Sequence, residues 1–336
     1  MTTDSDSTIF TFDDDNSKHT SITAQETIKI LYYCIGTVGF LGNLMVVVII
    51  GTSKSMRKTT TNRFIMHQSC CDGTVAVILM LSTLFEDDGR KLSGIADEIY
   101  CRLWLTKTFL WGSLVTSTYN LVTMTLERYL SIVHPILHKN RWNKKVFIAC
   151  ICMVWVLGFG YNLAFMVPST VIIGGDCNLY YKWPSVETQQ GQGIFTIVFQ
   201  FFIPLIVLIV CYSRMALILK GKIQPTDDAN NKASKNMARA RRNVIKTLIL
   251  VGVSFVLCWI WNQILFVLFN LGFPVNFNGN FYHFTVVAVF CNCCINPFIY
   301  IIKYEQFQRK LIRFRGMCFR NDQPLQSELS NSVGYT

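Results

Sequence analysis

Charged residues are scarce in this sequence. They make up 15% of the 336 residues, whereas hydrophobic residues make up 51%. Soluble globular domains carry charge at about a quarter of their positions, so this composition excludes an ordinary soluble protein. The hydrophobic residues gather in long runs separated by short polar stretches, and this pattern predicts a protein that crosses a membrane several times.

Signatures of several other protein classes are absent as well. The sequence opens with MTTDSDSTIFTFDDD, which lacks the basic start and early apolar core of a signal peptide. We find no catalytic triad, metal-ligand spacing or phosphate-binding glycine loop, so we expect no enzymatic activity. Transporters usually show two related halves with broken helices, and we find neither. An ion channel or transporter is therefore kept only as a secondary alternative.

Seven hydrophobic runs are long enough to cross a bilayer, which takes roughly 20 residues each. They cover residues 28–50, 64–85, 103–133, 146–167, 194–219, 244–271 and 281–302. Segments of this length in lipid are helices, because their backbone groups must be satisfied internally. We therefore predict an all-α seven-transmembrane-helix bundle over residues 28–302. Residues 1–27 would be a flexible, acidic extracellular tail, 303–316 an amphipathic helix on the membrane surface, and 317–336 a cytoplasmic tail.

The charges orient this bundle. Basic residues are concentrated in one set of loops and acidic residues in the other. Because positive charge stays on the cytoplasmic side, we expect an extracellular N-terminus and a cytoplasmic C-terminus. The net charge of +11 is then a topology signal, and we expect no nucleic-acid partner. The third run is the weakest, since Lys107, Glu127 and Arg128 interrupt it.

Thirteen cysteines are present, and two of them fall on the predicted outer face. Cys101 and Cys177 most simply form one disulfide on this oxidising side, and two free thiols are the alternative. Cys318 follows a basic amphipathic stretch beyond the seventh run. It is a candidate palmitoylation site, with an unmodified thiol as the other possibility.

Polar residues inside the predicted spans are candidates for function, because burying them in a membrane is costly. One carboxylate and several hydroxyl and amide groups lie well within the runs: Asn43, Asp72, Ser117, Asn292 and Asn296. They could form a hydrogen-bond network that holds the bundle together. They could also form a hard-cation site built from oxygen ligands.

Two further motifs lie near the cytoplasmic ends of the runs. Glu127 and Arg128 are adjacent, and they form either a helix-end ion pair or a switch in which the arginine leaves the glutamate. In NPFIY, residues 296–300, Pro297 removes a backbone hydrogen bond and predicts a kink.

Taken in order, these motifs resemble the rhodopsin-like (class A) G-protein-coupled receptors over about residues 28–318. The matching features are GNLMV at 42–46, Asp72, Cys101, ERY at 127–129, Trp155, Pro204 with Tyr212, FVLCW at 255–259, and CINPFIY followed by Phe307. Single motifs of this kind are weak, but the ordered set, one for each helix, is specific.

The resemblance implies roles for particular residues. A sodium pocket, with sodium as an allosteric ligand, would consist of Asp72, Ser117, Asn292 and Asn296. The extracellular disulfide would join Cys101 to Cys177. The activation switch would comprise Glu127, Arg128, Tyr129, Tyr212, Trp259, Asn296, Pro297 and Tyr300. A heterotrimeric G-protein would contact Arg128, Pro135 and Ile136 at the cytoplasmic face.

The sequence also departs from the family pattern. Arg128 follows Cys101 by 27 residues, which is longer than usual, so we expect the outer start of the third helix to be shifted or bulged. The family's Leu-Ala pair before the helix-two aspartate is replaced here by Gln68 and Ser69.

The sixth helix lacks the proline of the family's CWxP motif and reads CWIW, with Trp261 in the proline's place. The backbone N–H of Trp261 is retained, so we expect a smaller bend at 257–261 than in the family. Ser254 bonding back to the preceding turn, or a water held by Asn262, could bend the helix instead.

The ligand class is narrowed by residues that are missing. Amine receptors carry an aspartate where this chain has Leu110, and opsins carry a lysine in the seventh helix, where residues 281–302 contain none. A peptide, a non-amine small molecule or a lipid remains. The acidic outer face would steer a basic ligand, although the tail could be merely solvated.

We therefore predict a plasma-membrane receptor for a short, basic or neutral, neuropeptide-like peptide. Its candidate contacts are Lys107, Trp111, Trp259, Asn262, Gln263 and His283. Asn262 and Gln263 could alternatively form only interhelical hydrogen bonds. An atypical receptor that binds ligand without coupling to a G-protein also stays open.

Overall fold

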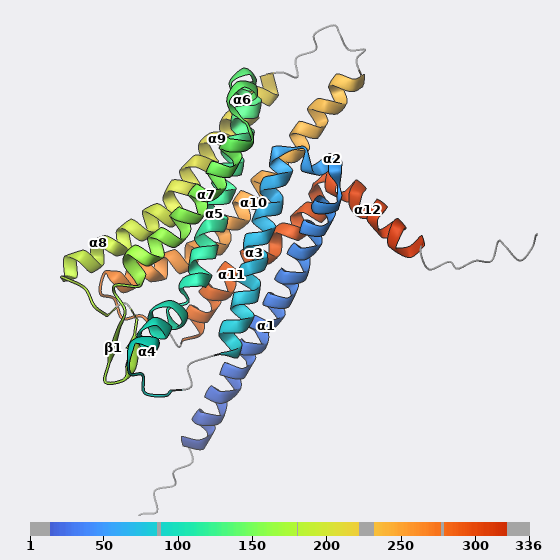
Figure 1. Cartoon of the computed structure of the whole chain (residues 1–336). Coiled ribbons are helices and arrows are strands. Elements are labelled where there is room, and N and C mark those ends of the chain that lie inside the picture. The colour runs from blue at the N-terminus through green and yellow to red at the C-terminus, as the bar shows by residue number, and fades with distance from the viewer. Residues whose placement is uncertain (1–13, 86–88, 180, 222–231, 277–278, 321–336) are drawn as a thin grey trace, which may run out of the picture.

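The computed structural model describes residues 14–85, 89–179, 181–221, 232–276 and 279–320. Long helices dominate it (Figure 1). They are α1 (Asp14–Thr52), α3 (Thr60–Leu84), α5 (Thr108–Val133), α7 (Lys144–Tyr161), α8 (Val186–Ile197), α9 (Ile203–Gly221), α10 (Lys232–Asn270) and α11 (Asn280–Lys303). Helix α8 continues into α9 through a π-helix, η3 (Val198–Phe202), so these segments form one span.

By length and composition, six helical segments of the described chain can cross a membrane. The seventh crossing, α5, has 26 residues but is not among these six segments, since its composition is not apolar enough. Most of its side chains are buried, including Ser113, Ser117 and Asn120. A helix surrounded by other helices can carry polar groups that would be costly against lipid. The predicted seven-helix bundle is confirmed. The third run is a weak hydrophobic signal because its helix packs among the other helices and faces little lipid.

The two ends of the bundle carry different short elements (Figure 1). The start of α1, the short helix α4 (Ile95–Ile99) and strand β1 (Val171–Ile173) lie at one end. At the opposite end lie α2 (Lys54–Arg57), α6 (Pro135–Arg141) and α12 (Glu305–Arg320). The elements at the first end belong to the predicted outer segments. Those at the opposite end belong to the predicted inner loops and to the helix that follows the seventh crossing.

Two boundaries differ from the prediction. Helix α1 begins at Asp14, so residues 14–27, predicted to belong to a flexible tail, are helical. Helix α10 begins at Lys232, well before the predicted run at 244–271. Helix α12 agrees with the predicted amphipathic helix, because Phe307 is fully buried while Ile312 on another face is 72% exposed. It continues to Arg320, so the first residues of the tail predicted over 317–336 are helical, and 321–336 lie outside the described residues.

A β-hairpin that the sequence analysis did not predict lies before the fifth crossing. Strands β1 (Val171–Ile173) and β2 (Asp176–Asn178) pair antiparallel, with Ile172 opposite Cys177. Gly174 and Gly175 form the turn with φ angles of 62° and 85°, which two-residue hairpin turns require and glycine adopts without strain. The predicted disulfide is confirmed: Cys177 is bonded to Cys101.

The start of the third crossing is bulged, as its long spacing predicted. A π-helix, η1 (Tyr100–Leu105), follows α4 and carries Cys101. Lys107 then adopts a left-handed conformation with φ 54°, and α5 begins at the next residue. A π-helix takes up extra residues relative to an α-helix, so the bulge accommodates the additional chain between Cys101 and Arg128.

The sixth crossing is continuous helix through the position where the family has proline. The Ser254 hydroxyl donates to the carbonyl of Val251 at 2.8 Å, so the predicted back-bonding is present. Trp261 points outward, is 42% exposed and contacts Phe284 edge-on at 6.1 Å. The smaller bend at 257–261 stays a prediction.

Candidate functional site

A small cavity of about 80 Å³ lies between the helices toward the outer end of the bundle. Three residues predicted to bind ligand line it: Trp111 of α5, and Asn262 and Gln263 of α10. Its other lining residues come from the fourth, fifth, sixth and seventh crossings: Tyr161, Asn162, Met166, Thr196, Gln200, Leu265, Phe266 and Tyr282. The lining is aromatic, apolar or neutral amide, and it contains no acidic or basic side chain.

Hydrogen bonds within the cavity wall leave one acceptor free. Gln263 donates from Nε2 to Gln200 Oε1 at 3.2 Å, while its own Oε1 is buried without a partner. Asn262 donates to Thr285 Oγ1 at 3.4 Å. Asn262 and Gln263 therefore bond between helices and also line the cavity, and their contact with a ligand stays a prediction. The free oxygen on Gln263 can accept a hydrogen bond from a ligand.

Three other predicted ligand contacts do not line this cavity. Trp259 is fully buried against Phe255, with a ring-centroid distance of 5.8 Å, and its indole N–H has no partner. His283 lies beside the Tyr32 hydroxyl at 3.4 Å. Lys107 precedes α5 in its left-handed conformation. Their contact with ligand stays a prediction.

A larger hollow of about 440 Å³ lies farther out, beside the end of the fourth crossing. Phe165, Trp183 and Lys182 are among the residues that line it. None of the predicted ligand residues lies there. We place the candidate ligand site at the smaller cavity, because that is where polar groups from several helices converge.

The amine-receptor position is occupied by a core residue. Leu110 is 1% exposed and packs in the main hydrophobic cluster, while its neighbour Trp111 faces the cavity. A protonated amine would find no carboxylate in the lining. The structure thus agrees with excluding an amine ligand.

Acidic side chains of the outer loops are largely paired with basic ones. Asp97 accepts from Arg90 at 2.9 Å, and Asp176 pairs with Lys91 at 2.7 Å. The pKa of the Asp97 carboxyl is lowered, chiefly by the backbone N–H of Ser93 and further by Arg90. These pairs reduce the field available to steer a basic ligand. The acidic residues at 86–88 and 1–13 lie outside the described part of the chain.

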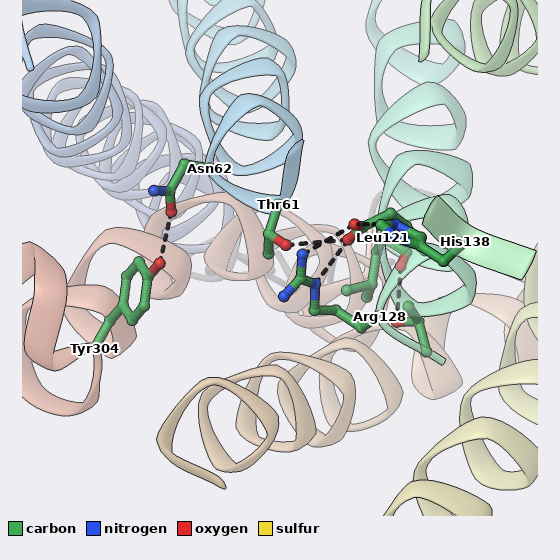
Figure 2. Close-up of polar contacts among 8 residues, drawn as sticks. Thr61, Asn62, Leu121, Arg128, His138 and Tyr304 are labelled. Atoms are coloured by element: carbon green, nitrogen blue, oxygen red, sulfur yellow. Dashed lines mark hydrogen bonds and ion pairs between the residues drawn. The ribbon is translucent and has the colours of Figure 1, made fainter. Parts of the chain in front are cut away.

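At the end of the bundle predicted to be cytoplasmic, a buried carboxylate holds the arginine of the ERY motif. Glu127 is fully buried and accepts from Arg128 Nε at 2.7 Å and from its Nη2 at 2.9 Å. Thr61 of α3 donates to the same carboxylate at 3.0 Å, and His138 Nε2 of α6 lies 3.0 Å from it. Figure 2 shows Thr61, Arg128 and His138 converging from these three elements. The ion pair is therefore more than a helix-end contact, because it also ties α3 and α6 to α5.

The predicted switch tyrosines lie apart from this ion pair. Tyr212 donates to the carbonyl of Leu248 in α10 at 2.9 Å and lies 3.0 Å from Thr125 Oγ1 in α5. Tyr300 is fully buried, and its hydroxyl has no protein partner. The two contacts of Tyr212 link the third, fifth and sixth crossings at their inner ends. The side-chain hydrogen bonds of Arg128 in the described part of the chain go to Glu127.

Three of the four predicted sodium-pocket residues are joined by hydrogen bonds. Asp72 accepts from Ser117 Oγ at 2.7 Å and from Asn296 Nδ2 at 2.9 Å. Asn292 is buried, but its Oδ1 has no partner. The hydrogen-bond network that the sequence predicted as one alternative is therefore present.

Comparison with known proteins matches this architecture to one family. Residues 42–300 match the family described as 7 transmembrane receptor (rhodopsin family). The chain belongs to this family. As a rhodopsin-family receptor it is a G-protein-coupled receptor and not an enzyme, in agreement with the sequence analysis.

Relatives of this receptor include proteins described as galanin and somatostatin receptors. The Galanin receptor 2a of Danio rerio is 24% identical over 306 residues, covering 88% of this chain and 79% of the relative. The Somatostatin receptor type 5 of Rattus norvegicus is 29% identical over 300 residues, covering 87% and 78%. The Bos taurus protein of the same name is 28% identical over 301 residues, covering 87% and 76%.

The inner surface of the receptor presents the predicted G-protein contacts. Pro135 begins α6, where its fixed φ suits the first helical position. Ile136 is 77% exposed and therefore accessible to a partner. Tyr129 is only partly buried and lies 5.9 Å from the His134 ring. Cys318 belongs to α12, but its side chain lies outside the described part of the structure, so palmitoylation there stays a prediction.

Sequence reasoning missed two residues of the cytoplasmic cluster. His138 joins the Glu127 carboxylate and stacks on Trp142 with a ring distance of 5.6 Å. Tyr304, which lies between α11 and α12, donates to Asn62 Oδ1 of α3 at 2.6 Å (Figure 2). A lone histidine or tyrosine near a predicted helix end carries no sequence signal for such contacts. Pro297 of the NPFIY motif, a residue of the predicted activation switch, packs closely against Gly42. A Cβ added to Gly42 would lie 3.2 Å from the Pro297 side chain.

Proposed function

We propose that this receptor sits in the plasma membrane with its N-terminus outside and that it binds a short peptide. The proposal rests chiefly on the cavity lining, in which neutral amides and aromatic rings face the ligand space without a charged side chain. A peptide offers backbone N–H donors that suit the unpaired Oε1 of Gln263. The peptide-receptor names of the relatives support the same class of ligand.

We further propose that the bound peptide activates a heterotrimeric G-protein. Glu127 holds Arg128 within α5 and also accepts from Thr61 of α3. Tyr212 of α9 donates to Leu248 of α10, so these contacts link helices at the inner end of the bundle. A peptide that favours a second arrangement would shift the population toward it by as much as its affinities for the two states differ. Releasing Arg128 would then open the inner end beside the exposed Ile136.

A panel of short amidated peptides, basic and neutral, tests the ligand class in cells that express the receptor. We expect at least one peptide to elicit G-protein signalling. Activation by a lipid or an indole compound, with every peptide inactive, would rule the peptide proposal out.

Replacing Gln263 with leucine should weaken the active peptide about tenfold, because one hydrogen bond near 1.4 kcal/mol is lost. The measurement is the concentration of peptide that gives half-maximal signalling. Ile264→Ala is the matched control, since Ile264 is adjacent in α10 and 43% exposed on the outer surface of the bundle. Equal potency of wild type and Gln263→Leu would remove this cavity as the ligand site.

A further inference from the structure

A chain of polar side chains crosses the bundle and ends at Asp72. Trp155 Nε1 in α7 lies 3.0 Å from His67 Nε2 in α3. His67 Nδ1 lies 2.9 Å from Asn120 Oδ1 in α5, and Asn120 Nδ2 lies 2.7 Å from Gln68 Oε1. The chain reaches the carboxylate through Gln68 Nε2, which is 3.4 Å from each oxygen of Asp72.

Every hydrogen bond in this chain has one possible direction. The Trp155 indole can only donate, so Nε2 of His67 accepts and the ring proton sits on Nδ1. His67 therefore donates to Asn120 Oδ1, which leaves the Asn120 amide nitrogen to donate to Gln68 Oε1. The remaining end of the Gln68 amide is its NH₂ group, and it must face Asp72.

Three side chains donate to the carboxylate of Asp72. Ser117 donates to Oδ1, Asn296 donates to Oδ2, and Gln68 Nε2 lies 3.4 Å from both oxygens. The NH₂ group of Gln68 has two hydrogens. One is donated to Ser117 Oγ in a short contact, and the other is shared between the two oxygens of Asp72.

These residues do not fit a sodium ion. A hard cation needs oxygen lone pairs directed at it, whereas here N–H and O–H hydrogens point at the carboxylate. The unpaired Oδ1 atoms of Asn292 and Asn296 are acceptors, but they are neutral, and the NH₂ group of Gln68 already lies against the carboxylate that would hold a cation. Such neutral acceptors suit buried water, which can donate to them.

We propose that the side-chain amide of Gln68 takes the place of a cation at Asp72, so that sodium does not bind this receptor there. Gln68 stands where the family pattern has leucine, which carries no polar atom. In the leucine variant both oxygens of Asp72 lose their contact with the Gln68 amide, and Ser117 Oγ loses the hydrogen bond that it accepts from Gln68. The substitution Gln68→Leu should therefore create a sodium response.

Thermal unfolding of the purified receptor in sodium chloride and in choline chloride, at equal ionic strength, measures this directly. An ion that binds only the folded receptor raises the stability of the folded state by mass action. We expect the same Tm for wild type in both salts. We expect Gln68→Leu to melt on the order of 2 °C higher in sodium than in choline.

Two variants complete the test. Gln68→Met removes the amide with an unbranched side chain of similar length and serves if the leucine variant folds poorly. The double variant Gln68→Leu with Asp72→Asn should lose the sodium response, because the charge is gone. A sodium-dependent Tm in wild type would overturn the proposal, as would the absence of a response in both Gln68→Leu and Gln68→Met.

This inference concerns the receptor without agonist or G-protein. Its measurement needs neither a peptide nor a signalling partner. A failure of the proposed peptide function would therefore leave the salt comparison intact, and a sodium response in wild type would leave the peptide proposal intact.

Discussion

Replacing Gly158 with valine should largely abolish folded receptor. Gly158 of α7 packs directly on α5, where an added Cβ would overlap Thr116 Oγ1 and lie 2.6 Å from the Gly112 carbonyl oxygen and 2.8 Å from the Thr116 backbone nitrogen. Backbone atoms cannot swing aside as a flexible side chain can, so the two helices must separate. Overpacking typically costs 1–3 kcal/mol and more where backbone is displaced. We expect a fall in Tm of about 10 °C or a failure to reach the cell surface.

Gly160→Val is the matched control for this substitution. Gly160 lies in the same helix and is exposed, and a Cβ there meets nothing within 4 Å. Both variants change helix propensity and composition identically, so the difference between them reports the contact with α5. Thermal unfolding and surface expression measure it. Equal stability of the two variants would contradict the close approach of α5 and α7.

Replacing Glu127 with glutamine should raise signalling in the absence of ligand about tenfold. Glutamine has almost the same shape, but it removes the charge that holds Arg128 and places an NH₂ group where one carboxylate oxygen accepts a hydrogen bond. Hydrogen bonds to charged groups contribute about 1.5–3 kcal/mol, and 1.4 kcal/mol is a tenfold change in an equilibrium. The population with Arg128 released should increase accordingly.

Basal guanine-nucleotide exchange, corrected for the amount of receptor, measures this effect. Glu98→Gln is the control, because Glu98 pairs with Arg102 at the opposite end of the bundle and its loss should leave basal activity unchanged. Unchanged basal activity in Glu127→Gln, with normal folding, would mean that the Glu127–Arg128 pair does not restrain the receptor.

The positions of the crossings along the sequence could be predicted, because they depend on the length and apolar composition of each run. The bulge before α5 was predicted from the resemblance, since the spacing from Cys101 to Arg128 is longer than in the family pattern. The hairpin was missed, although VIIGGDCN carries a usable signal: two glycines between short β-branched and polar segments. The helical extension of α1 to Asp14 has no comparable signal, because its residues are polar.

The candidate sites were predicted in part. Facing positions on one helix, such as Trp259 and Gln263, follow from helical periodicity, and the structure buries both. Contacts between helices do not follow from periodicity. The participation of His138 at Glu127, and the chain from Trp155 to Asp72, depend on how α3, α5, α6 and α7 are juxtaposed. In the sequence, Gln68 could be identified only as a departure from the family pattern. The direction of its amide follows from the hydrogen bond that it accepts from Asn120, and this contact is seen only in the structure.

The central claim, a peptide-activated receptor that couples to a G-protein, is tested most directly by guanine-nucleotide exchange with purified components. Purified receptor is mixed with members of each G-protein family and with the amidated peptide panel. We predict that at least one peptide accelerates exchange on at least one G-protein, and that Arg128→Ala abolishes the acceleration. No acceleration by any peptide on any G-protein family, with Glu127→Gln also inactive, would contradict the account and indicate a receptor that does not couple.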